Sequence, residues 1–227
     1  MSSFILLPDE ESSPQSCRLH RLTGQKPPLK PKEVWAILIR LQIQCKYCDL
    51  ALFNLAVDSK LRSCDLVALR INDVLTASSV RERTVITQQK TGRPVQFELT
   101  EQTRLAVHDW ITFKDLRSGD YLFPSRVSTC SHLSTRQYVN TSIRQYVNTS
   151  IRQYARIVNL LVASIGLDPH NYGTHSLRRT KAALIYKKTG NLRAVQLLLG
   201  HTKQESTVRY LGIEVDDALK ISEQVEL

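Results

Sequence analysis

The sequence predicts a mainly α-helical fold that carries one small antiparallel β-sheet. Apolar residues recur at helical spacing through most of the chain, beginning with Val34, Trp35, Leu38 and Leu41. Two short stretches in the middle instead combine β-branched residues with apolar–polar alternation, and a turn containing Gly and Pro lies between them. Hydrophobic residues make up 42% and charged residues 23% of the 227, as in globular proteins that bury a full core.

The N-terminal part of the chain divides into an expected arm and the start of a domain. Residues 1–31 are rich in Ser and Pro and are expected to form a flexible arm. The single domain is then expected over residues 32–227. Its first part, residues 32–57, has dense apolar residues at helical spacing, which predicts two helices with a break near residues 44–46.

A β-hairpin is expected after a short helix at about residues 64–69. Residues 84–87 are β-branched, residues 95–99 alternate between apolar and polar, and residues 90–94 (Lys-Thr-Gly-Arg-Pro) form the turn between them. A third strand is expected near residues 71–75. The β-structure is therefore a small sheet inserted in a helical domain.

Helices are expected again after the hairpin. Thr100 is the expected N-cap of a helix that runs to about Lys114, and a loop around Pro124 follows it. The later helices are expected at about residues 150–165, 176–188, 191–199 and 215–223.

One segment contains an exact octapeptide repeat. The sequence Arg-Gln-Tyr-Val-Asn-Thr-Ser-Ile occupies residues 136–143 and returns unchanged at residues 144–151. Two copies are too few for a stacked repeat architecture. We interpret residues 136–151 as a tandem insertion in front of the helix that begins near Arg152, and we assign it no function.

The positive charge is concentrated in the body of the chain. The formal net charge is +10, but residues 1–16 carry −3 and residues 213–227 carry −4, which leaves +17 for residues 17–212. A body this basic indicates a polyanionic partner, because release of counterions from phosphates is a strong source of affinity. A basic surface that binds nothing is the alternative at this point.

Cysteine content and hydropathy point to the cytoplasm. The five cysteines are odd in number and show no disulfide framework, and no signal peptide is visible. Cys45 and Cys48 form a Cys-x-x-Cys pair, but no second pair is present, so no metal site is expected. No apolar run approaches the roughly 20 residues of a membrane helix.

A group of residues in the last third of the chain suggests phosphate chemistry. His175 and Arg178 are three residues apart and share one face of a helix. Gly200 is expected to end a helix and leave His201 at its mouth, and Tyr210 follows nine residues later. Each alone has an ordinary explanation as a structural His, a solvated Arg or a core Tyr, and only their order and spacing together favour a site.

With Arg62 and Lys90 upstream, this order resembles the tyrosine recombinases, the phage-integrase family. The resemblance covers about residues 32–215, and there are two departures from the family pattern. Lys60 stands where Gly is usual, and the helical DNA-clamping domain is not expected, since 31 residues are too few to build it. In this the chain resembles the small DNA-inversion recombinases. The matching segments are residues 60–70, 90–92, 173–180 (Gly-Thr-His-Ser-Leu-Arg-Arg-Thr), 198–202 (Leu-Leu-Gly-His-Thr) and 207–211 (Thr-Val-Arg-Tyr-Leu).

The resemblance implies the catalytic-domain fold of that family and a role for each matched residue. Tyr210 would attack a phosphodiester and form a 3′-phosphotyrosine. Arg62 and Arg178 would hold the non-bridging oxygens, and His201 would donate a further hydrogen bond to them. His175 would act as base or orienting group for Tyr210.

The remaining implied roles concern the leaving group and the surroundings of the site. Lys90 would protonate the leaving 5′-oxygen from the hairpin. Asp65 would orient Arg62. Arg93 and Arg179 would contact backbone phosphates, with a solvated role as the alternative for both. No metal or other cofactor is implied, because fixed cations can supply the charge stabilisation.

The function expected from these residues is that of a site-specific recombinase acting on double-stranded DNA by integration, excision or inversion. A homo-oligomer is expected, a tetramer on paired sites, and the C-terminal helix at about residues 214–227 would dock on a neighbouring protomer or fold back on its own core. The alternatives are a non-catalytic DNA-binding protein on the same fold and a type IB-like topoisomerase.

Overall fold

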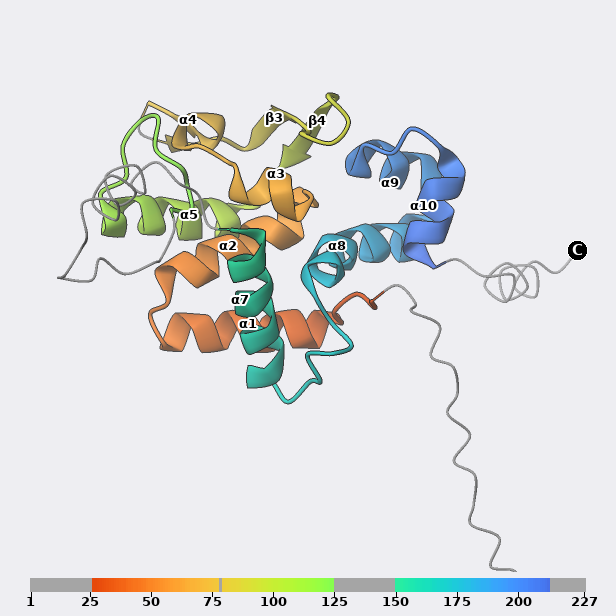
Figure 1. Cartoon of the computed structure of the whole chain (residues 1–227), viewed down its shortest axis with the longest axis horizontal. Coiled ribbons are helices and arrows are strands. Elements are labelled where there is room, and N and C mark those ends of the chain that lie inside the picture. The colour runs from red at the N-terminus through yellow and green to blue at the C-terminus, as the bar shows by residue number, and fades with distance from the viewer. Residues whose placement is uncertain (1–25, 78, 125–149, 213–227) are drawn as a thin grey trace, which may run out of the picture.

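The computed structural model describes residues 26–77, 79–124 and 150–212, and its architecture is mostly helical (Figure 1). The described strands form two separate two-stranded antiparallel sheets. The expected fold class is confirmed. The elements in chain order are α1 Pro31–Ile43, α2 Tyr47–Ser59, α3 Ser63–Val67, α4 Ile71–Val74, β1 Leu75–Thr76, β2 Ser79–Val80, β3 Arg83–Thr87, β4 Pro94–Glu98, α5 Glu101–Lys114, α7 Ile151–Ser164, α8 Thr174–Thr189, α9 Leu192–Leu199 and α10 Gln204–Leu211.

Helix α2 is the centre of the domain and packs against α1, α5 and α8. It follows α1 after a short break in which Cys45 takes a left-handed conformation with φ of +50°, so the expected break near residues 44–46 is confirmed. Leu52, Phe53 and Leu55 are all buried. Because successive residues of α2 are buried, this helix has no solvent face and needs neighbours on every side.

The β3–β4 hairpin forms as expected, with Arg83 opposite Glu98 and Thr87 opposite Pro94. The third strand expected near residues 71–75 is wrong for residues 71–74, which form the short helix α4, and Leu75 begins strand β1, which pairs with β2 and not with the hairpin. The backbone N–H of Arg70 donates to the Asp73 carboxylate at 2.8 Å, which caps the first turn of α4. One helical turn buries the two apolar residues of α4, Ile71 and Val74, on the same side.

Helix α5 begins at the expected cap Thr100, and α7 begins where a helix was expected, with Ser150 as its cap. The Thr100 hydroxyl accepts from the backbone N–H of Thr103 at the start of α5, and the Ser150 hydroxyl accepts from that of Gln153 at the start of α7. Helices α8 and α9 also lie where expected. Helix α10 was not expected from the sequence. The octapeptide insertion up to residue 149 and the helix at 214–227 lie outside the described residues.

Two apolar clusters divide the described part of the chain. The large core joins α1 to α5, the hairpin, α7 and Leu177 of α8. The small cluster joins the other face of α8 to α9 and α10 through Ala182, Val195, Leu199 and the half-buried Tyr210. Figure 1 shows α9 and α10 on one side of the hairpin, with α8 below them, and α9 contacts β4. Helix α8 therefore connects the two parts, and the residues between them come from both.

The segment before α1 packs on the body of the protein. Leu29 is buried, and its backbone N–H donates to the Thr180 hydroxyl at 3.1 Å. Arg179 donates to the carbonyl oxygen of Lys26 at 2.6 Å. Residues 26–30 thus pack on α8, although they were predicted from the sequence to belong to the flexible arm. The division into an arm and a catalytic domain otherwise stays a prediction.

Two kinds of feature are absent from the described residues. They include no helix that is both long and apolar enough to cross a membrane. They also include no group of three or more His, Cys, Asp or Glu side chains placed to hold a metal ion.

Candidate active site

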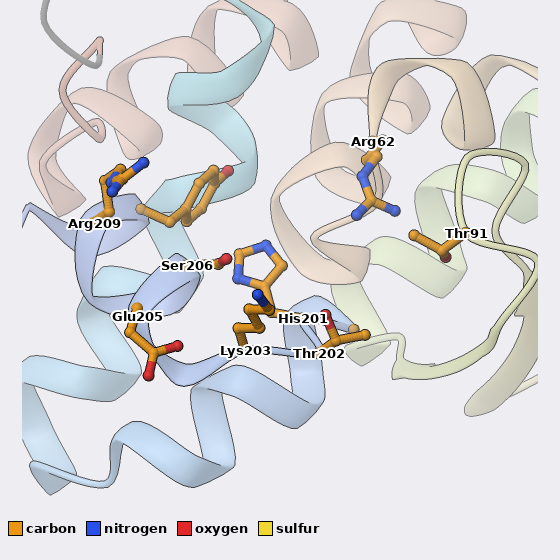
Figure 2. A pocket seen from close by; sticks show the side chains of 10 residues that line it. Arg62, Thr91, His201, Thr202, Lys203, Glu205, Ser206 and Arg209 are labelled. Carbon is orange, nitrogen blue, oxygen red and sulfur yellow. The ribbon is translucent and has the colours of Figure 1, made fainter.

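A pocket of about 680 Å³ opens between the hairpin and helices α9 and α10. Figure 2 shows Arg62 and Thr91 on one wall and His201 and Thr202 facing them from the other. Residues that lie more than one hundred positions apart in the sequence therefore meet around one space. The lining residues are Arg62, Thr91, Gly200, His201, Thr202, Lys203, Glu205, Ser206, Arg209 and Tyr210.

Arg178 is held at the ends of two helices. It is 4% exposed, and its Nε donates to the carbonyl oxygen of Lys60 at 2.7 Å. Its Nη2 donates to the carbonyl oxygen of Leu199 at 2.8 Å. These carbonyls lie at the C-terminal ends of α2 and α9, where the helix dipole favours a cation. The third nitrogen, Nη1, makes no hydrogen bond to the described residues and is left to bind a ligand.

The structure shows how a lysine is accommodated at position 60, where the family usually has glycine. It ends α2 with φ of +55°, a left-handed conformation that glycine adopts more easily. Its side chain is buried and its Nζ donates to the carbonyl oxygen of Asp58 at 2.8 Å. Burial, followed by the nearby charge of Lys181, lowers the pKa of Lys60 to about 8. The backbone carbonyl still reaches Arg178, so the turn keeps its function with a lysine.

Gln88 is a site residue that the sequence did not single out. It is buried, its Oε1 accepts from Arg62 Nη1 and from the Thr91 hydroxyl, and its Nε2 donates to the carbonyl of Leu199 at 3.5 Å. The same carbonyl accepts from Arg178. Gln88 thus connects Arg62, the hairpin turn and the end of α9.

Gly200 allows the hairpin to approach the end of α9. It has φ of +66°, and a Cβ built there would come within 2.5 Å of Val95 Cγ2 and 3.0 Å of Gln88 Nε2. A side chain at this position would push the hairpin away from Arg178 and His201. The sequence predicted Gly200 only as a helix end, whereas the close contact depends on the tertiary structure.

Asp65 does not contact Arg62. One of its oxygens accepts from the backbone N–H of Gln89 at 2.9 Å, and the Cys64 thiol lies 3.7 Å from the same oxygen. Asp65 therefore holds the end of strand β3 against α3, and the orienting contact expected for it is made by Gln88 instead. The reason is local: Asp65 is one turn further along the chain and points to the hairpin backbone.

His201 follows the C-terminal end of α9, and its ring is contacted by Thr207 and by Tyr210. Its Nδ1 is 3.1 Å from the Thr207 hydroxyl, and its ring meets that of Tyr210 edge-on, with centroids 5.3 Å apart and planes at 85°. Burial, and then the charges of Arg178 and Arg62, lower the pKa of His201 to about 4. At neutral pH the imidazole is therefore uncharged.

Tyr210 lies on α10 with two guanidinium groups against its ring. The Cζ atoms of Arg178 and Arg179 are 5.4 and 4.7 Å from the ring centroid. Burial raises the pKa of the phenol, and the charges of Arg178, Arg179 and Arg62 offset this only in part. The hydroxyl is therefore protonated at neutral pH and must lose its proton to act as a nucleophile.

Arg179 lies in a different place from the surface position considered above. It is 7% exposed, bonded to the Lys26 carbonyl and stacked on Tyr210. In this position it is buried and supports the tyrosine ring. The sequence could not distinguish it from Arg178, because adjacent basic residues on a helix look alike until the helix is packed.

The remaining expected residues lie around the pocket. His175, in the first turn of α8, is exposed; partial burial and the charges of Arg178, Arg179 and Arg62 lower its pKa. Lys90 and Arg93 are exposed on the turn between β3 and β4. Thr91, next to Lys90, lines the pocket. The structure thus groups Arg62, His175, Arg178, His201 and Tyr210, and leaves Lys90 on the hairpin beside them.

The sequence is similar to those of known integrases and tyrosine recombinases. Residues 28–215 match the phage integrase family. A probable integrase/recombinase, YoeC of Bacillus subtilis, is 27% identical over 168 residues, which is 74% of this chain and 79% of that protein. The tyrosine recombinase XerD of Rickettsia prowazekii is 24% identical over 180 residues, which is 75% of this chain and 52% of that protein.

Solved structures share the fold. The XerA recombinase superposes with a TM-score of 0.65 at 17% identity, covering 88% of this chain and 65% of that chain. The XerH recombinase bound to its difH substrate gives 0.62 at 18% identity, covering 88% and 55%. The chain thus spans only about half to two thirds of these structures. Its fold is that of a tyrosine-recombinase catalytic domain. The chain belongs to the phage integrase family.

Proposed function

We propose that this chain is a site-specific recombinase that cuts and rejoins DNA through a 3′-phosphotyrosine at Tyr210. One observation carries the proposal: Arg62, His201 and Tyr210, from three separate segments, line one pocket in which cations predominate, and Arg178 lies against the ring of Tyr210. A phosphodiester is the anion that such a pocket fits, because two planar guanidiniums and an imidazole can each donate to its non-bridging oxygens.

The proposed cleavage step follows from the charges. Attack by the Tyr210 oxygen adds negative charge to the phosphate oxygens. Arg62, held by Gln88, and Arg178, held by two carbonyls, are already oriented and need no rearrangement. Donors fixed in this way stabilise a developing charge by about 3–4 kcal/mol each.

The proton transfers require a base and an acid on opposite sides of the phosphate. His175 has a lowered pKa, so it is neutral at pH 7 and can accept the phenolic proton. Lys90, on the exposed hairpin turn, is the proposed donor to the leaving 5′-oxygen. The phosphotyrosine conserves the energy of the broken bond, so a 5′-hydroxyl of another strand can reverse the step without a cofactor.

The proposed partners are double-stranded DNA and further copies of this chain. The charge of +17 over residues 17–212 suits a polyanion. One structural neighbour, the XerH recombinase, is bound to its difH substrate. Exchange requires two strands to be cut at each of two sites, so we propose a tetramer on paired sites, with residues 214–227 docking between protomers. Arg93 is proposed to contact backbone phosphates, and the cytoplasm is the proposed location.

A suicide DNA substrate tests the proposal. A nick just beyond the cleavage position lets the short fragment with the released 5′-hydroxyl diffuse away, so a covalent protein–DNA complex accumulates. Tyr210→Phe should give none while binding DNA as well as wild type. Tyr186→Phe, which alters another tyrosine at the same small apolar cluster, is the matched control and should still form the complex.

Two results would contradict the proposal in different ways. Undiminished covalent complex with Tyr210→Phe would exclude this nucleophile. Relaxation of supercoiled DNA without strand exchange on any paired site would favour a topoisomerase instead.

A further inference from the structure

We propose that Thr207 is a positioning residue that fixes the tautomer of His201, so that Nε2 carries the proton and donates into the pocket. The proposal rests on the proposed function in one respect, because a phosphate oxygen is the acceptor that Nε2–H would meet. The geometry itself does not depend on that function.

Thr207 is placed for this contact by helix α10. It is 0% exposed, and its Oγ1 lies 3.1 Å from Nδ1 of His201. It precedes Tyr210 by three residues, so the two side chains leave α10 from the same face. The His201 ring lies between them, bonded to one and edge-on to the other. One helical turn thus presents both the proposed nucleophile and the partner of the imidazole.

The direction of the hydrogen bond follows from the surroundings of the hydroxyl. Thr180 and Thr189 each donate to the carbonyl four residues earlier, at 2.8 Å. The Thr207 hydroxyl makes no such bond among the described residues, and its one hydrogen bond there is to His201. A buried hydroxyl whose hydrogen has no acceptor loses its hydration without compensation. Thr207 therefore donates, and Nδ1 accepts.

The consequence for the pocket follows from the number of ring protons. A neutral imidazole carries one N–H, and burial near Arg178 and Arg62 keeps His201 neutral at pH 7. When Nδ1 accepts from Thr207, the single proton must be on Nε2. The opposite tautomer would place a lone pair at the pocket, where it would repel a phosphate oxygen. The threonine thus decides whether His201 donates or repels.

NMR of the full-length protein tests the tautomer without any DNA. Long-range proton–nitrogen spectra of histidine-labelled protein at pH 7 distinguish the two tautomers, and the His201 signal is assigned by its loss in His201→Gln. We expect the Nε2–H form in wild type and in Thr207→Ser, which keeps the hydroxyl. Thr207→Val keeps the shape without the hydroxyl and should give a mixture. A wild-type His201 with its proton on Nδ1 would overturn the proposal.

Cleavage of the suicide substrate tests the consequence. Thr207→Val should lower the single-turnover rate about tenfold, the value of one hydrogen bond, and Thr207→Ser should restore most of it. Thr112→Val, on the exposed face of α5, is the control for a threonine-to-valine change in a helix. Equal rates for wild type and Thr207→Val would refute the role in cleavage. Failure of the wild type to cleave would instead refute the proposed function, and the NMR result would still decide the tautomer.

Discussion

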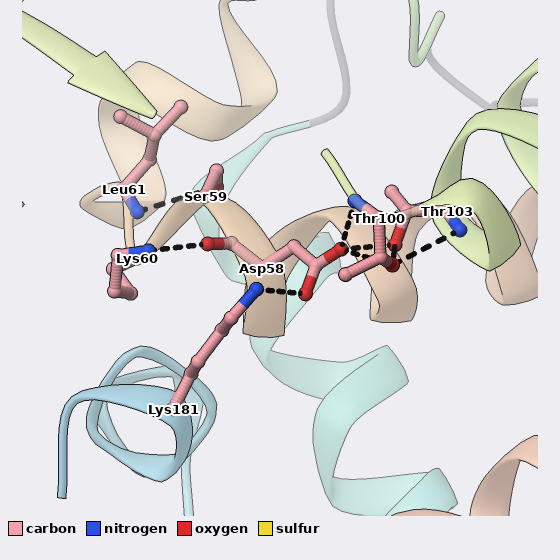
Figure 3. A network of polar contacts seen from close by, with 7 residues as sticks. All are labelled: Asp58, Ser59, Lys60, Leu61, Thr100, Thr103 and Lys181. Atoms are coloured by element: carbon pink, nitrogen blue, oxygen red, sulfur yellow. Dashed lines mark hydrogen bonds and ion pairs between the residues drawn. The ribbon is translucent and has the colours of Figure 1, made fainter. Parts of the chain in front are cut away.

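Two groups of polar and charged side chains lie near the C-terminal end of α2, and they differ in the source of their negative charge. The Asp58 cluster consists of Asp58, Lys60, Thr100, Thr103 and Lys181 (Figure 3). The arginine cluster consists of Arg62, His175, Arg178, Arg179 and His201. The Asp58 cluster contains its own anion. Beside the arginine cluster lies Asp65, whose carboxylate instead accepts from the backbone N–H of Gln89 on the hairpin.

The Asp58 cluster satisfies its anion within the protein. Asp58 Oδ1 accepts from Lys181 at 2.7 Å, and Oδ2 accepts from Thr100 N at 2.9 Å and from the hydroxyls of Thr100 and Thr103 at 2.6 and 2.5 Å. Burial would raise the pKa of Asp58, but these bonds outweigh it and keep the pKa below its usual value. The cluster joins α2, α5 and α8, so its function is structural.

The arginine cluster is closed by backbone carbonyls and remains short of negative charge. Arg178 and Arg179 donate to the carbonyls of Lys60, Leu199 and Lys26, which satisfy hydrogen bonds without neutralising charge. Buried charge is costly unless it is paired. A fold that holds Arg62 and Arg178 beside a pocket by hydrogen bonds to uncharged amide and carbonyl oxygens is therefore arranged for an anion from outside. The difference between the clusters lies in where the anion comes from.

The largest expected effect is on stability, from removal of the internal anion. Asp58→Ala leaves Lys181 without its paired carboxylate and removes the acceptor of the Thr100 backbone N–H and of the Thr100 and Thr103 hydroxyls. The free energy of unfolding should fall by about 3–5 kcal/mol, as for other broken buried ion pairs. Urea denaturation measures this, with Asp109→Ala on the exposed side of α5 as the control. A loss no larger than that of the control would show that the Asp58 cluster is not structural.

The next effect falls on cleavage. Arg178→Lys keeps the charge but cannot donate to both carbonyls and to a phosphate at once. The cleavage rate on the suicide substrate should fall about 100-fold or more, while DNA affinity changes much less. Gel-shift and single-turnover measurements separate the two. If DNA affinity falls strongly while the cleavage rate of bound DNA stays normal, Arg178 only binds the DNA and has no role in cleavage.

A substitution that introduces a carboxylate should make the arginine cluster resemble the Asp58 cluster. Gln88→Glu places a carboxylate where Arg62 now meets an amide oxygen. It should compete with phosphate for Arg62 and lower cleavage by about tenfold, the value of one ionic hydrogen bond. Gln89→Glu, its exposed neighbour, adds the same charge outside the pocket and is the matched control. Equal losses from both variants would mean that only the general charge of the hairpin matters.

The smallest effect concerns Lys60, which contributes to both clusters. Its pKa is about 8 when folded and 10.5 is its ordinary value, so between these values the unfolded chain holds a proton that the folded chain has released. The stability of wild type relative to Lys60→Met should therefore rise as the pH goes from 8 to 9, by about 1 kcal/mol. Denaturation of both proteins across this range measures it. A difference independent of pH would show that Lys60 keeps its ordinary pKa.

Much of the fold was predictable because its signals are local. The caps at Thr100 and Ser150, the apolar spacing of α1 and α7 and the alternation in β4 depend on neighbours within a few residues. The prediction of a strand was wrong for residues 71–74, because a four-residue apolar pattern fits either a strand or one helical turn. Helix α10 has a single buried residue, Thr207, and so lacks the apolar spacing that would have revealed it.

The order and spacing of Arg62, Lys90, His175, Arg178, His201 and Tyr210 were in the sequence by itself, and so were the basic body and the mainly helical class. These are properties of residue type and position along the chain. The roles of Gln88, Thr207, Asp65 and Arg179 were decided only by the tertiary structure. Gln88 and Gln89 are chemically identical, as are Arg178 and Arg179, and only packing determines which one is turned inward. A hydrogen bond depends on distances of a few ångströms between segments far apart in sequence, and no local pattern records those distances.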